Sequence, residues 1–597
     1  MSTHPKAYAS ALLGSVLLSL AALALSCSEG SDATPAGATG RPDAGARPDA
    51  SLGPDATTQD ADGGKTDGPH GSDAGGPATE AGNDASAPVS TTPQPLVPTT
   101  SFYPRAILLE NGAILASVVA TQASGRLGAT FLESDDDAIS FHVVGNIDDT
   151  LMAGGICCGT LYELPSAIGA IPAGALFWAA SLGQGQSAAP MTITVWLSTD
   201  HGQTWAFSSN AVVASAAYSG NNGLWEPEFS MLDDGTLVCH YSDETDPAHS
   251  QKLARVRSSD GVTWADPSDT VAPTTFGIRP GMANVRRPTG GPFIMSYEVC
   301  GVPGDDCAAH FRTSTDGWDW GDATNVGTQP QTVDGLYFAH APTLAWTSSP
   351  GQMGRLYMMG QMTMQPDGGD APQNGNFLLA SPQEGNQLWY ALPAPVPVPA
   401  PSNKPCPNYS SPILPLDDGR VALEIASMVE GTDCRSYFAR GPLTGTGDRS
   451  GIVSGATYRF LSTMSGLCLD GLDVTGGSLD AGGNVQQWNC DDLPPQSWIA
   501  SAGTGQTVTL TSQNSGMCLS FAGDAATAGT SVEQLPCTGA PDQTWTVQNV
   551  GLGYYVFGQP EAGTCLDVSG GSTSAGGNID VWTCNSLAPQ IWYAEEQ

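Results

Sequence analysis

Charged residues are scarce in this chain, and basic residues are the scarcest. Charged residues make up 13% of the 597 residues, where the average for globular proteins is roughly 25%. The 20 Lys and Arg stand against 59 Asp and Glu, which gives a formal net charge of -39. This charge repels phosphate backbones and anionic lipid headgroups, so nucleic acid is excluded as a bulk electrostatic partner.

Long hydrophobic runs are equally scarce. The run from about residue 9 to residue 25 is shorter than the roughly 20 apolar residues that a spanning helix needs. Lys6 precedes this run and small residues lead into Cys27, which is the pattern of an export signal over residues 1–27. The segment LALSC at 23–27 resembles a bacterial lipobox, in which the cysteine is acylated. We expect an extracellular protein held at the cell surface or outer membrane through Cys27, with free secretion as the alternative and no other membrane contact.

Metal-binding patterns are missing as well. The 14 cysteines lie mostly in the second half of the chain, and their number fits an oxidising compartment. Cys157 and Cys158 are adjacent and Cys239 is left over, but no C-x-x-C pair or clustered histidine accompanies them. We favour buried thiols or a vicinal disulfide over zinc, and we expect neither a metal nor a cofactor. Further candidate pairs, whose connectivity the sequence leaves open, are Cys300 with Cys307 and Cys406 with Cys434.

Residues 28–98 contain mainly Ala, Gly, Asp, Pro, Ser and Thr. With almost no large apolar residue, this segment cannot form a core and is predicted to be a disordered, extended linker. The whole chain has 73 Gly and 45 Pro, together about a fifth of its length, which indicates many turns and little helix.

Residues 99–447 carry a repeated turn motif. The segments STDHGQTW at 198–205, SSDGVTW at 258–264 and STDGWDW at 314–320 are spaced by 60 and 56 residues, a period typical of propeller blades. In each, an Asp side chain can accept backbone N–H bonds, a Gly can take positive φ and a Trp can cover the turn. The pattern resembles the Asp-box of sialidase-like propellers and is expected to be structural.

Short apolar strands also recur, and each is followed by a turn and a second strand. Six such openings predict an all-β, six-bladed β-propeller over residues 99–447. They begin near Tyr103, Thr160, Trp225, Arg279, His340 and Tyr409.

Three carboxylates on these strands are candidates for catalysis. Glu226 and Glu228 lie two residues apart on one strand, so we expect both on the same face. Glu298 ends a strand of the next predicted blade. Glycoside cleavage requires paired carboxylates, one as nucleophile or base and one as proton donor. The alternative is that they are buried structural partners of arginines, namely Arg105, Arg279 or Arg286.

The segments around these carboxylates resemble glycoside hydrolase family 93, the exo-α-1,5-L-arabinanases. They are WEPEF at 225–229, YSDE at 241–244, HSQKL at 249–253, RPGM at 279–282 and MSYE at 295–298. The resemblance implies a six-bladed propeller that retains anomeric configuration and releases arabinobiose, with Glu226 as nucleophile and Glu298 as acid/base. Glu228 leaves open which carboxylate of its pair attacks. Candidate substrate contacts, with core packing as the alternative for the aromatic residues, are Glu228, Tyr241, Arg279, Tyr337, His340 and Arg105.

Two other functions stay open. A sialidase shares the Asp-boxes, but its first Arg usually lies in an F/Y-R-I-P segment, whereas residues 103–106 here read YPRA. A neutral sugar is therefore favoured. The third possibility is a non-catalytic surface carbohydrate-binding protein whose propeller is a scaffold.

Residues 448–597 follow a different period. Gln-x-Trp recurs at 496–498, 543–545 and 590–592, at an interval of 47 residues. This stretch resembles a ricin-type β-trefoil lectin, a family 13 carbohydrate-binding module. The resemblance implies three repeated units whose Trp residues form the core, and one disulfide in each unit. The expected bridges are Cys468–Cys490, Cys518–Cys537 and Cys565–Cys584.

A sugar site in such a unit needs an Asp, a second polar residue and an aromatic platform. The first unit has Asp470, Gln486 and Trp488, and the third has Asp567, Asp580 and Trp582. The middle unit has Ser520 and Leu535 in the Asp and Trp places. We expect two working sites, a dead middle unit, and a monomer whose partner is a polysaccharide, either arabinan or a related plant or cell-surface glycan.

Overall fold

The computed structural model describes residues 92–597, except 186–188, 305–306, 349–353, 382–387, 417–418, 472–478, 492, 524–525 and 560–561. The predicted export signal, Cys27 and most of the predicted linker lie outside the described residues. Among the described residues, no helix has both the length and the apolar character needed to span a membrane.

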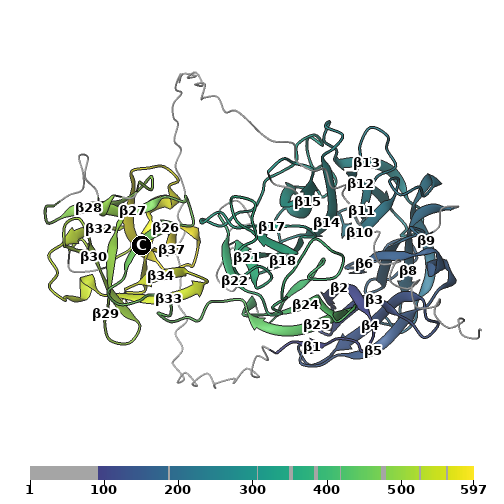
Figure 1. Ribbon diagram of the computed structural model, residues 1–597, viewed down its shortest axis with the longest axis horizontal. Coiled ribbons are helices and arrows are strands. Elements are labelled where there is room, and N and C mark those ends of the chain that lie inside the picture. The colour runs from purple at the N-terminus through teal and green to yellow at the C-terminus, as the bar shows by residue number, and fades with distance from the viewer. Residues whose placement is uncertain are drawn as a thin grey trace, which may run out of the picture. The chain divides into compact units, whose positions relative to one another are not determined.

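The described residues of the propeller form six antiparallel sheets, one for each predicted blade (Figure 1). Blade 1 has β2 (Ser101–Leu108), β3 (Ile114–Thr121), β4 (Leu127–Ser134) and β5 (His142–Ile147). After the short 3-10 helix η1 (Thr150–Gly154), blade 2 has β6 (Ile156–Glu163), β7 (Leu176–Leu182), β8 (Pro190–Ser198) and β9 (Ala206–Ala217). Blade 3 has β10 (Leu224–Met231), β11 (Leu237–Asp243), β12 (Lys252–Ser258) and β13 (Ala265–Val271).

The second half of the propeller continues this order with two variations: blade 4 has a fifth strand, and blade 6 takes one strand from the start of the propeller. Blade 4 has β14 (Arg279–Arg286), β15 (Phe293–Cys300), β16 (Ala308–Ser314), β17 (Tyr337–Ala339) and β20 (Met362–Met364). Blade 5 has β18 (Thr343–Thr347), β19 (Arg355–Met359), β21 (Phe377–Ser381) and β22 (Tyr390–Pro393). Blade 6 has β23 (Ile413–Leu416), β24 (Val421–Glu430), β25 (Asp433–Pro442) and the early strand β1 (Gln94–Pro95). Because β1 pairs with β25, residues from both ends of the propeller complete one blade and close the ring.

The first strand of each blade lies at the centre of the ring. Strand β6 contacts β2 and β10, β14 contacts β10 and β18, and β23 contacts β18 and β2. The central strands therefore touch one another in a closed circle, and the side chains they carry converge on the propeller axis.

The three predicted Asp-boxes are turns that follow the third strand of blades 2, 3 and 4. Asp260 accepts the backbone N–H groups of Val262 and Thr263 at 2.8 and 2.6 Å, and these bonds lower its pKa to about 2. Gly261 has a φ of 74°, as the turn requires.

A fourth turn of this type, which sequence analysis missed, lies between β4 and β5. Ser134 Oγ donates to Asp136 and accepts from Ala138 N, and Ser140 N donates to Asp136. Ala138, at a φ of 60°, stands where the other turns have glycine, and Phe141 takes the place of the tryptophan.

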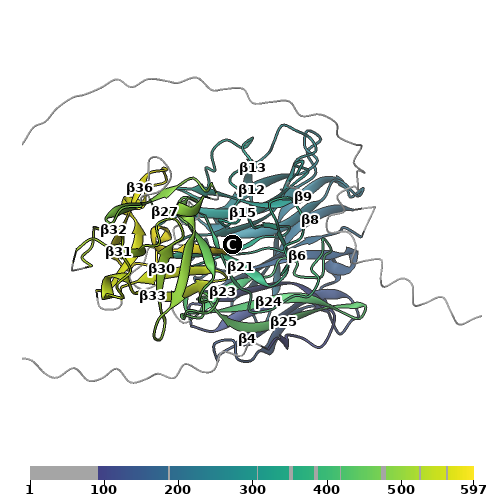
Figure 2. The same ribbon diagram turned by 60° about the vertical axis from the view of Figure 1, so that its left-hand side comes forward.

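The remaining strands form a β-trefoil, coloured green to yellow in Figure 2. Its first unit has β26 (Thr457–Ser462), β27 (Cys468–Gly471), β28 (Gly483–Trp488), η3 (Pro494–Gln496) and β29 (Trp498–Ala502). The second has β30 (Thr507–Ser512), β31 (Cys518–Phe521), β32 (Thr530–Leu535), η4 (Pro541–Gln543) and β33 (Trp545–Gly551). The third has β34 (Tyr554–Gly558), β35 (Thr564–Val568), η5 (Ser569–Gly571), β36 (Gly577–Thr583), η6 (Ala588–Gln590) and β37 (Trp592–Glu596).

The three Gln-x-Trp motifs form the trefoil core as predicted. Trp498, Trp545 and Trp592 are fully buried, and each donates its indole N–H to the backbone carbonyl of a buried leucine in its own unit. Gln496 donates to Asn489 O and accepts from Asp491 N, so the buried glutamine satisfies backbone groups of the loop that follows β28.

The cysteine pairing also follows the prediction. The three trefoil bridges are present, and so are Cys300–Cys307, Cys406–Cys434 and the vicinal Cys157–Cys158. Cys239 is a buried free thiol.

Candidate functional site

A ring of strained backbone positions surrounds the propeller axis. Each blade has a non-glycine residue of positive φ on or just before its first strand, at a site where an L-residue rarely adopts that conformation. They are Tyr103 (52°), Cys158 (66°), Glu226 (57°), Met282 (60°), Ala341 (47°) and Ser410 (57°). In β2, β6, β10 and β14 this residue lies in a break of the pairing register with the second strand. Such bulges redirect side chains and are common next to active sites.

Glu226 lies in this ring and is held from two sides. Its side chain is buried, with 7% of the residue exposed. The carboxylate oxygen Oε2 accepts Ser242 Oγ at 2.7 Å and the backbone N–H of Met282 at 3.0 Å. Met282 is the bulge residue of the next blade, so the ring itself supplies a donor to the carboxylate. Glu226 N in turn donates to Ser181 Oγ in the preceding blade.

Burial sets the protonation of Glu226. Desolvation raises the pKa of this carboxyl to about 7, and the bonds from Ser242 and Met282 oppose the rise because they favour the ionised form. The nearby Glu244 carboxylate raises the pKa further, whereas the Arg279 guanidinium lowers it. The group is therefore placed to change charge near neutral pH.

Glu298 is held in the same way one blade further round. It lies on β15 directly opposite Gly281, the neighbour of Met282. Its Oε2 accepts the backbone N–H of Ala341, the positive-φ residue just before the first strand of blade 5, at 2.8 Å. The ring Nδ1 of His340 lies 3.9 Å from the same oxygen. The two predicted catalytic carboxylates thus come from neighbouring blades, and each is bound by the positive-φ residue of the blade that follows.

Glu228 has a different environment from Glu226. Its two oxygens accept Thr160 Oγ at 2.8 Å, Asn284 Nδ2 at 3.0 Å and Arg286 Nη1 at 2.8 Å. The bulge between Trp225 and Glu228 interrupts the strand alternation, so the expectation that both carboxylates share one face on a regular strand does not hold. The partners of Glu228 come from blades 2 and 4, which makes it a brace between central strands.

The three predicted arginines form hydrogen bonds or ion pairs with other residues of the protein. Arg105 Nη1 donates to the carbonyl and hydroxyl oxygens of Ser410 at 3.0 and 2.8 Å, and its guanidinium lies 4.4 Å from the centre of the Tyr103 ring. Arg279 Nη2 donates to Glu244 at 2.6 Å and to the Gln251 side chain at 2.8 Å. Arg286 pairs with Glu228, as described above.

The aromatic candidates differ in exposure. Tyr241 is 3% exposed on β11 within the hydrophobic core shared by blades 1 to 3, which favours the packing interpretation. Tyr337 on β17 is also 3% exposed. The side chain of His340 is 14% exposed next to Glu298, which makes it the most accessible of the three.

The predicted sugar-binding residues of the trefoil are brought together in two units. In the first, Asp470 lies opposite Gln486 across β27 and β28, and Gln486 Nε2 donates to Asp470 at 3.2 Å. Trp488, two residues further along β28, is 40% exposed. A buried carboxylate beside an exposed indole is the arrangement that binds a sugar by hydrogen bonding and stacking.

The third unit repeats this arrangement with a second acid. Asp567 lies opposite Asp580 across β35 and β36, and Trp582 is 48% exposed. Burial raises the pKa of Asp567 to about 6, and the facing Asp580 carboxylate adds to the rise. In mildly acidic solution the Asp567 carboxyl is therefore partly protonated.

The middle unit lacks the aromatic platform, because Leu535 occupies that position. Its Ser520 hydroxyl donates to Asp542 on η4 at 2.6 Å. Asp542 is the residue before the motif glutamine, where the other units have Pro495 and Pro589. A carboxylate therefore still lies beside Ser520, a feature that sequence analysis missed.

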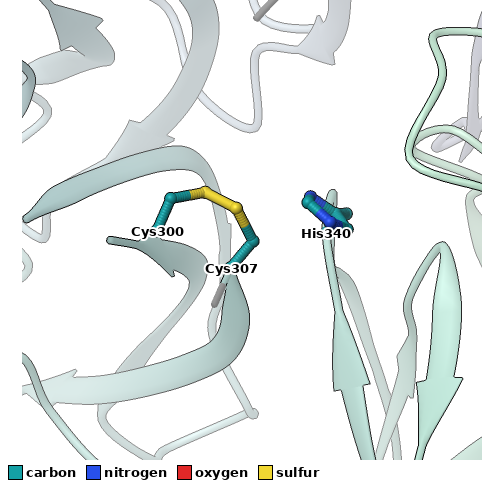
Figure 3. A group of neighbouring side chains, drawn as sticks. All are labelled: Cys300, Cys307 and His340. Atoms are coloured by element: carbon teal, nitrogen blue, oxygen red, sulfur yellow. A yellow bond between two sulfur atoms is a disulfide. The ribbon is translucent and has the colours of Figure 1, made fainter. Parts of the chain in front are cut away.

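Two groups of side chains among the described residues could hold a metal ion. One is Glu133, Asp135 and His142 on the surface of blade 1, and the other is Cys300, Cys307 and His340. In the second group, drawn in Figure 3, the two cysteines form a disulfide.

Sequence analysis also missed the residues that hold the catalytic candidates. Ser181, Ser242, Met282 and Ala341 were not predicted to contribute. Ser242 lies in the YSDE segment beside Glu226 and could have been suspected. The donors from Met282 and Ala341 are backbone groups at positions of positive φ, and no residue type marks such a position here.

Comparison with known proteins gives a domain family for the C-terminal part. Residues 456–595 match the family model of the ricin-type beta-trefoil lectin domain. No curated protein matches the chain in sequence.

Among solved structures, the propeller region is similar to two fungal enzymes. An alpha-L-arabinanase of Penicillium chrysogenum, complexed with arabinobiose, is 23% identical with a TM-score of 0.49, over 58% of this chain and 94% of that one. The GH93 alpha-L-arabinofuranosidase of Fusarium graminearum with arabinobiose is 22% identical with a TM-score of 0.49, over 58% and 93%. The trefoil region is similar to the Macrolepiota procera ricin B-like lectin in complex with lactose, at 22% identity and a TM-score of 0.22, over 25% and 100%.

Proposed function

We propose that this protein is an extracellular, exo-acting, retaining glycoside hydrolase that releases short arabinose oligomers from α-1,5-arabinan. The observation that carries the proposal is a pair of buried carboxylates, Glu226 on a central strand and Glu298 on the strand that pairs with the next central strand. Each accepts a backbone N–H from the positive-φ residue of the following blade. Fixed donors of this kind hold a carboxylate in one orientation, as a reaction at a single sugar carbon requires.

Glu226 is the proposed nucleophile. It attacks the anomeric carbon of the terminal sugar and forms a covalent glycosyl-enzyme intermediate. Its two donors, Ser242 Oγ and Met282 N, favour the ionised form that attack needs. Glu228 is a poor alternative because it is already bound by Thr160 and Asn284 and by the charge of Arg286.

Glu298 is the proposed acid/base. It protonates the departing glycosidic oxygen in the first step and deprotonates a water molecule in the second. This chemistry requires the two carboxyl groups about 5–5.5 Å apart, against roughly 6.5–9.5 Å for inversion. The mechanism requires an ionised Glu226 and a Glu298 that carries a proton when the bond breaks. His340 Nδ1, 3.9 Å from Glu298, is placed to orient the acid or a sugar hydroxyl.

A neutral sugar fits the site better than sialic acid does. A sialidase needs arginines that are free to bind the substrate carboxylate. Here Arg105, Arg279 and Arg286 are engaged by Ser410, Glu244 and Glu228. Removing any of these arginines from its partner would leave a buried polar or charged group unpaired.

The trefoil is proposed to bind the polysaccharide through its first and third units and to hold the propeller near its substrate. Two sites on one domain strengthen attachment to a polymer by raising the effective concentration of the second contact. The proposed location is the cell surface, with Cys27 as the lipid anchor. Membrane fractionation of a Cys27→Ser variant tests this, and a wild-type protein found wholly in the medium would contradict it.

Product analysis tests the function. Linear arabinan, arabinoxylan and a sialylated glycan are incubated in parallel with wild type and with Glu226→Gln. We expect a disaccharide from arabinan with wild type, and no product with the variant. Release of sialic acid would favour the sialidase alternative. No product from any glycan, with binding to arabinan intact, would favour a non-catalytic carbohydrate-binding protein.

A further inference from the structure

The disulfide between Cys300 and Cys307 lies beside the proposed acid/base. Cys300 Sγ is 3.8 Å from Glu298 Oε1, and Glu298 Oε2 is 3.9 Å from His340 Nδ1. Ligand atoms of Cys300, Cys307 and His340 all lie within 4.8 Å of one another. Figure 3 shows the disulfide and the imidazole facing each other across a short gap.

These residues carry the ligand types of a tetrahedral zinc site. Zinc binds thiolate sulfur at about 2.3 Å, and imidazole nitrogen or carboxylate oxygen at about 2.0–2.2 Å. In a tetrahedron, neighbouring ligand atoms are then roughly 3.3–3.8 Å apart. The Cys300–Glu298 distance of 3.8 Å and the Glu298–His340 distance of 3.9 Å involve different oxygens of the Glu298 carboxylate, so one of these oxygens would complete the coordination of an ion held by Cys300, Cys307 and His340. The two sulfur atoms are too close in the oxidised protein, because they are bonded to each other.

We propose that reduction of the Cys300–Cys307 disulfide creates a zinc site formed by Cys300, Cys307, His340 and Glu298. A dithiol supplies two electrons and two protons, breaks the sulfur–sulfur bond and leaves as its own cyclic disulfide. Zn²⁺ then displaces the two thiol protons and binds two thiolates, the neutral imidazole and the carboxylate. Cys307 is buried, but the His340 side chain is 14% exposed, which gives the ion a path of entry.

Zinc at this site would switch off the proposed reaction. A carboxylate bound to zinc cannot carry the proton that Glu298 has to give to the leaving oxygen. The ion would also hold His340 away from the sugar. Zinc would therefore inhibit the reduced protein and leave the oxidised protein active. This consequence rests on the function proposed above, whereas binding of the ion does not.

Cobalt binding tests the site independently of activity. The full chain is reduced with a dithiol, freed of reductant under anaerobic conditions and titrated with Co²⁺, which gives a charge-transfer absorption when thiolates bind it. We expect one equivalent of thiolate-bound Co²⁺ in reduced wild type and none in oxidised wild type. The band should disappear in Cys300→Ser/Cys307→Ser. It should persist in the matched control Cys406→Ser/Cys434→Ser, which removes a different propeller disulfide.

A second variant tests the site in case the Cys300→Ser/Cys307→Ser protein does not fold. His340→Gln keeps the disulfide, and we expect it to weaken Co²⁺ binding to the reduced protein at least about tenfold, since even outer-shell partners of a metal contribute this much. No thiolate band in reduced wild type, or an equal band in Cys300→Ser/Cys307→Ser, would overturn the proposal. If Co²⁺ binds as expected but neither redox form cleaves arabinan, the zinc site stands and the proposed function fails.

Discussion

Replacement of Glu226 by glutamine should abolish catalysis and stabilise the fold above neutral pH. Burial raises the pKa of Glu226 from 4.5 to about 7. The folded protein therefore holds this proton more tightly than the unfolded chain does. The contribution of Glu226 to stability is fully present below pH 4.5 and is lost as the pH rises through 7. At about 1.4 kcal/mol per pKa unit, the ionised side chain costs the fold roughly 3 kcal/mol.

Glutamine is neutral at every pH and keeps an oxygen that can accept from Ser242 and Met282. We expect the free energy of unfolding of Glu226→Gln, relative to wild type, to rise by about 3 kcal/mol between pH 4.5 and pH 8. Urea unfolding of the propeller at the two pH values measures this difference. Arabinan hydrolysis by the same preparation should be absent.

Glu424 provides a matched control. It is fully buried on β24, accepts the backbone N–H of Val396 at 2.7 Å, and has a pKa that burial raises to about 8. Glu424→Gln should show the same direction of stability change and keep its turnover. If the relative stability of Glu226→Gln does not change with pH, the reasoning about burial is wrong. If that variant keeps turning over arabinan, Glu226 is not the nucleophile.

Three further predictions concern the acid and the lectin sites. Glu298→Ala should lower turnover of arabinan about 10²–10⁴-fold and spare an aryl arabinoside whose leaving group needs no protonation; equal losses on both substrates in steady-state assays would contradict the acid role. In calorimetric titration with arabinose oligomers, Trp488→Ala and Trp582→Ala should each remove one of two trefoil sites, whereas Leu535→Ala should change nothing; three equivalent sites in wild type would refute the assignment. Because the pKa of Asp567 is raised to about 6, sugar binding by the third unit, measured in Trp488→Ala, should weaken as the pH falls below 6, and constant affinity down to pH 5 would show that its ionised form is not needed.

Sequence patterns with a fixed spacing predicted the fold well. The Asp-boxes and the Gln-x-Trp motifs repeat because each turn or core position demands one residue type, and both features are present at the expected residues. The six predicted openings correspond to the six central strands or to residues next to them. The fourth turn of the Asp-box type, which lies in blade 1, was missed. In it, Ala138 replaces the expected glycine and Phe141 replaces the tryptophan.

The site was predictable only in part. Glu226 and Glu298 could be proposed as catalytic from their residue type, but the groups that hold them include backbone N–H donors at positions of positive φ, which every residue except proline can supply. The bulge before Glu228 also could not be read from the sequence, since positive φ in this ring occurs at Tyr, Cys, Glu, Met, Ala and Ser. Contacts between blades, such as Glu228 with Arg286, depend on ring closure rather than on local pattern.

The configuration of the first product tests the central claim most directly. Linear α-1,5-arabinan is incubated with wild type in an NMR tube, and the anomeric proton of the newly released reducing sugar is followed before it equilibrates. We predict a disaccharide that appears first as the α-anomer, because Glu226 and Glu298 would act through a covalent intermediate with retention. First appearance of the β-anomer would mean inversion, and a spectrum that never changes would mean that the two carboxylates do not form an arabinanase site.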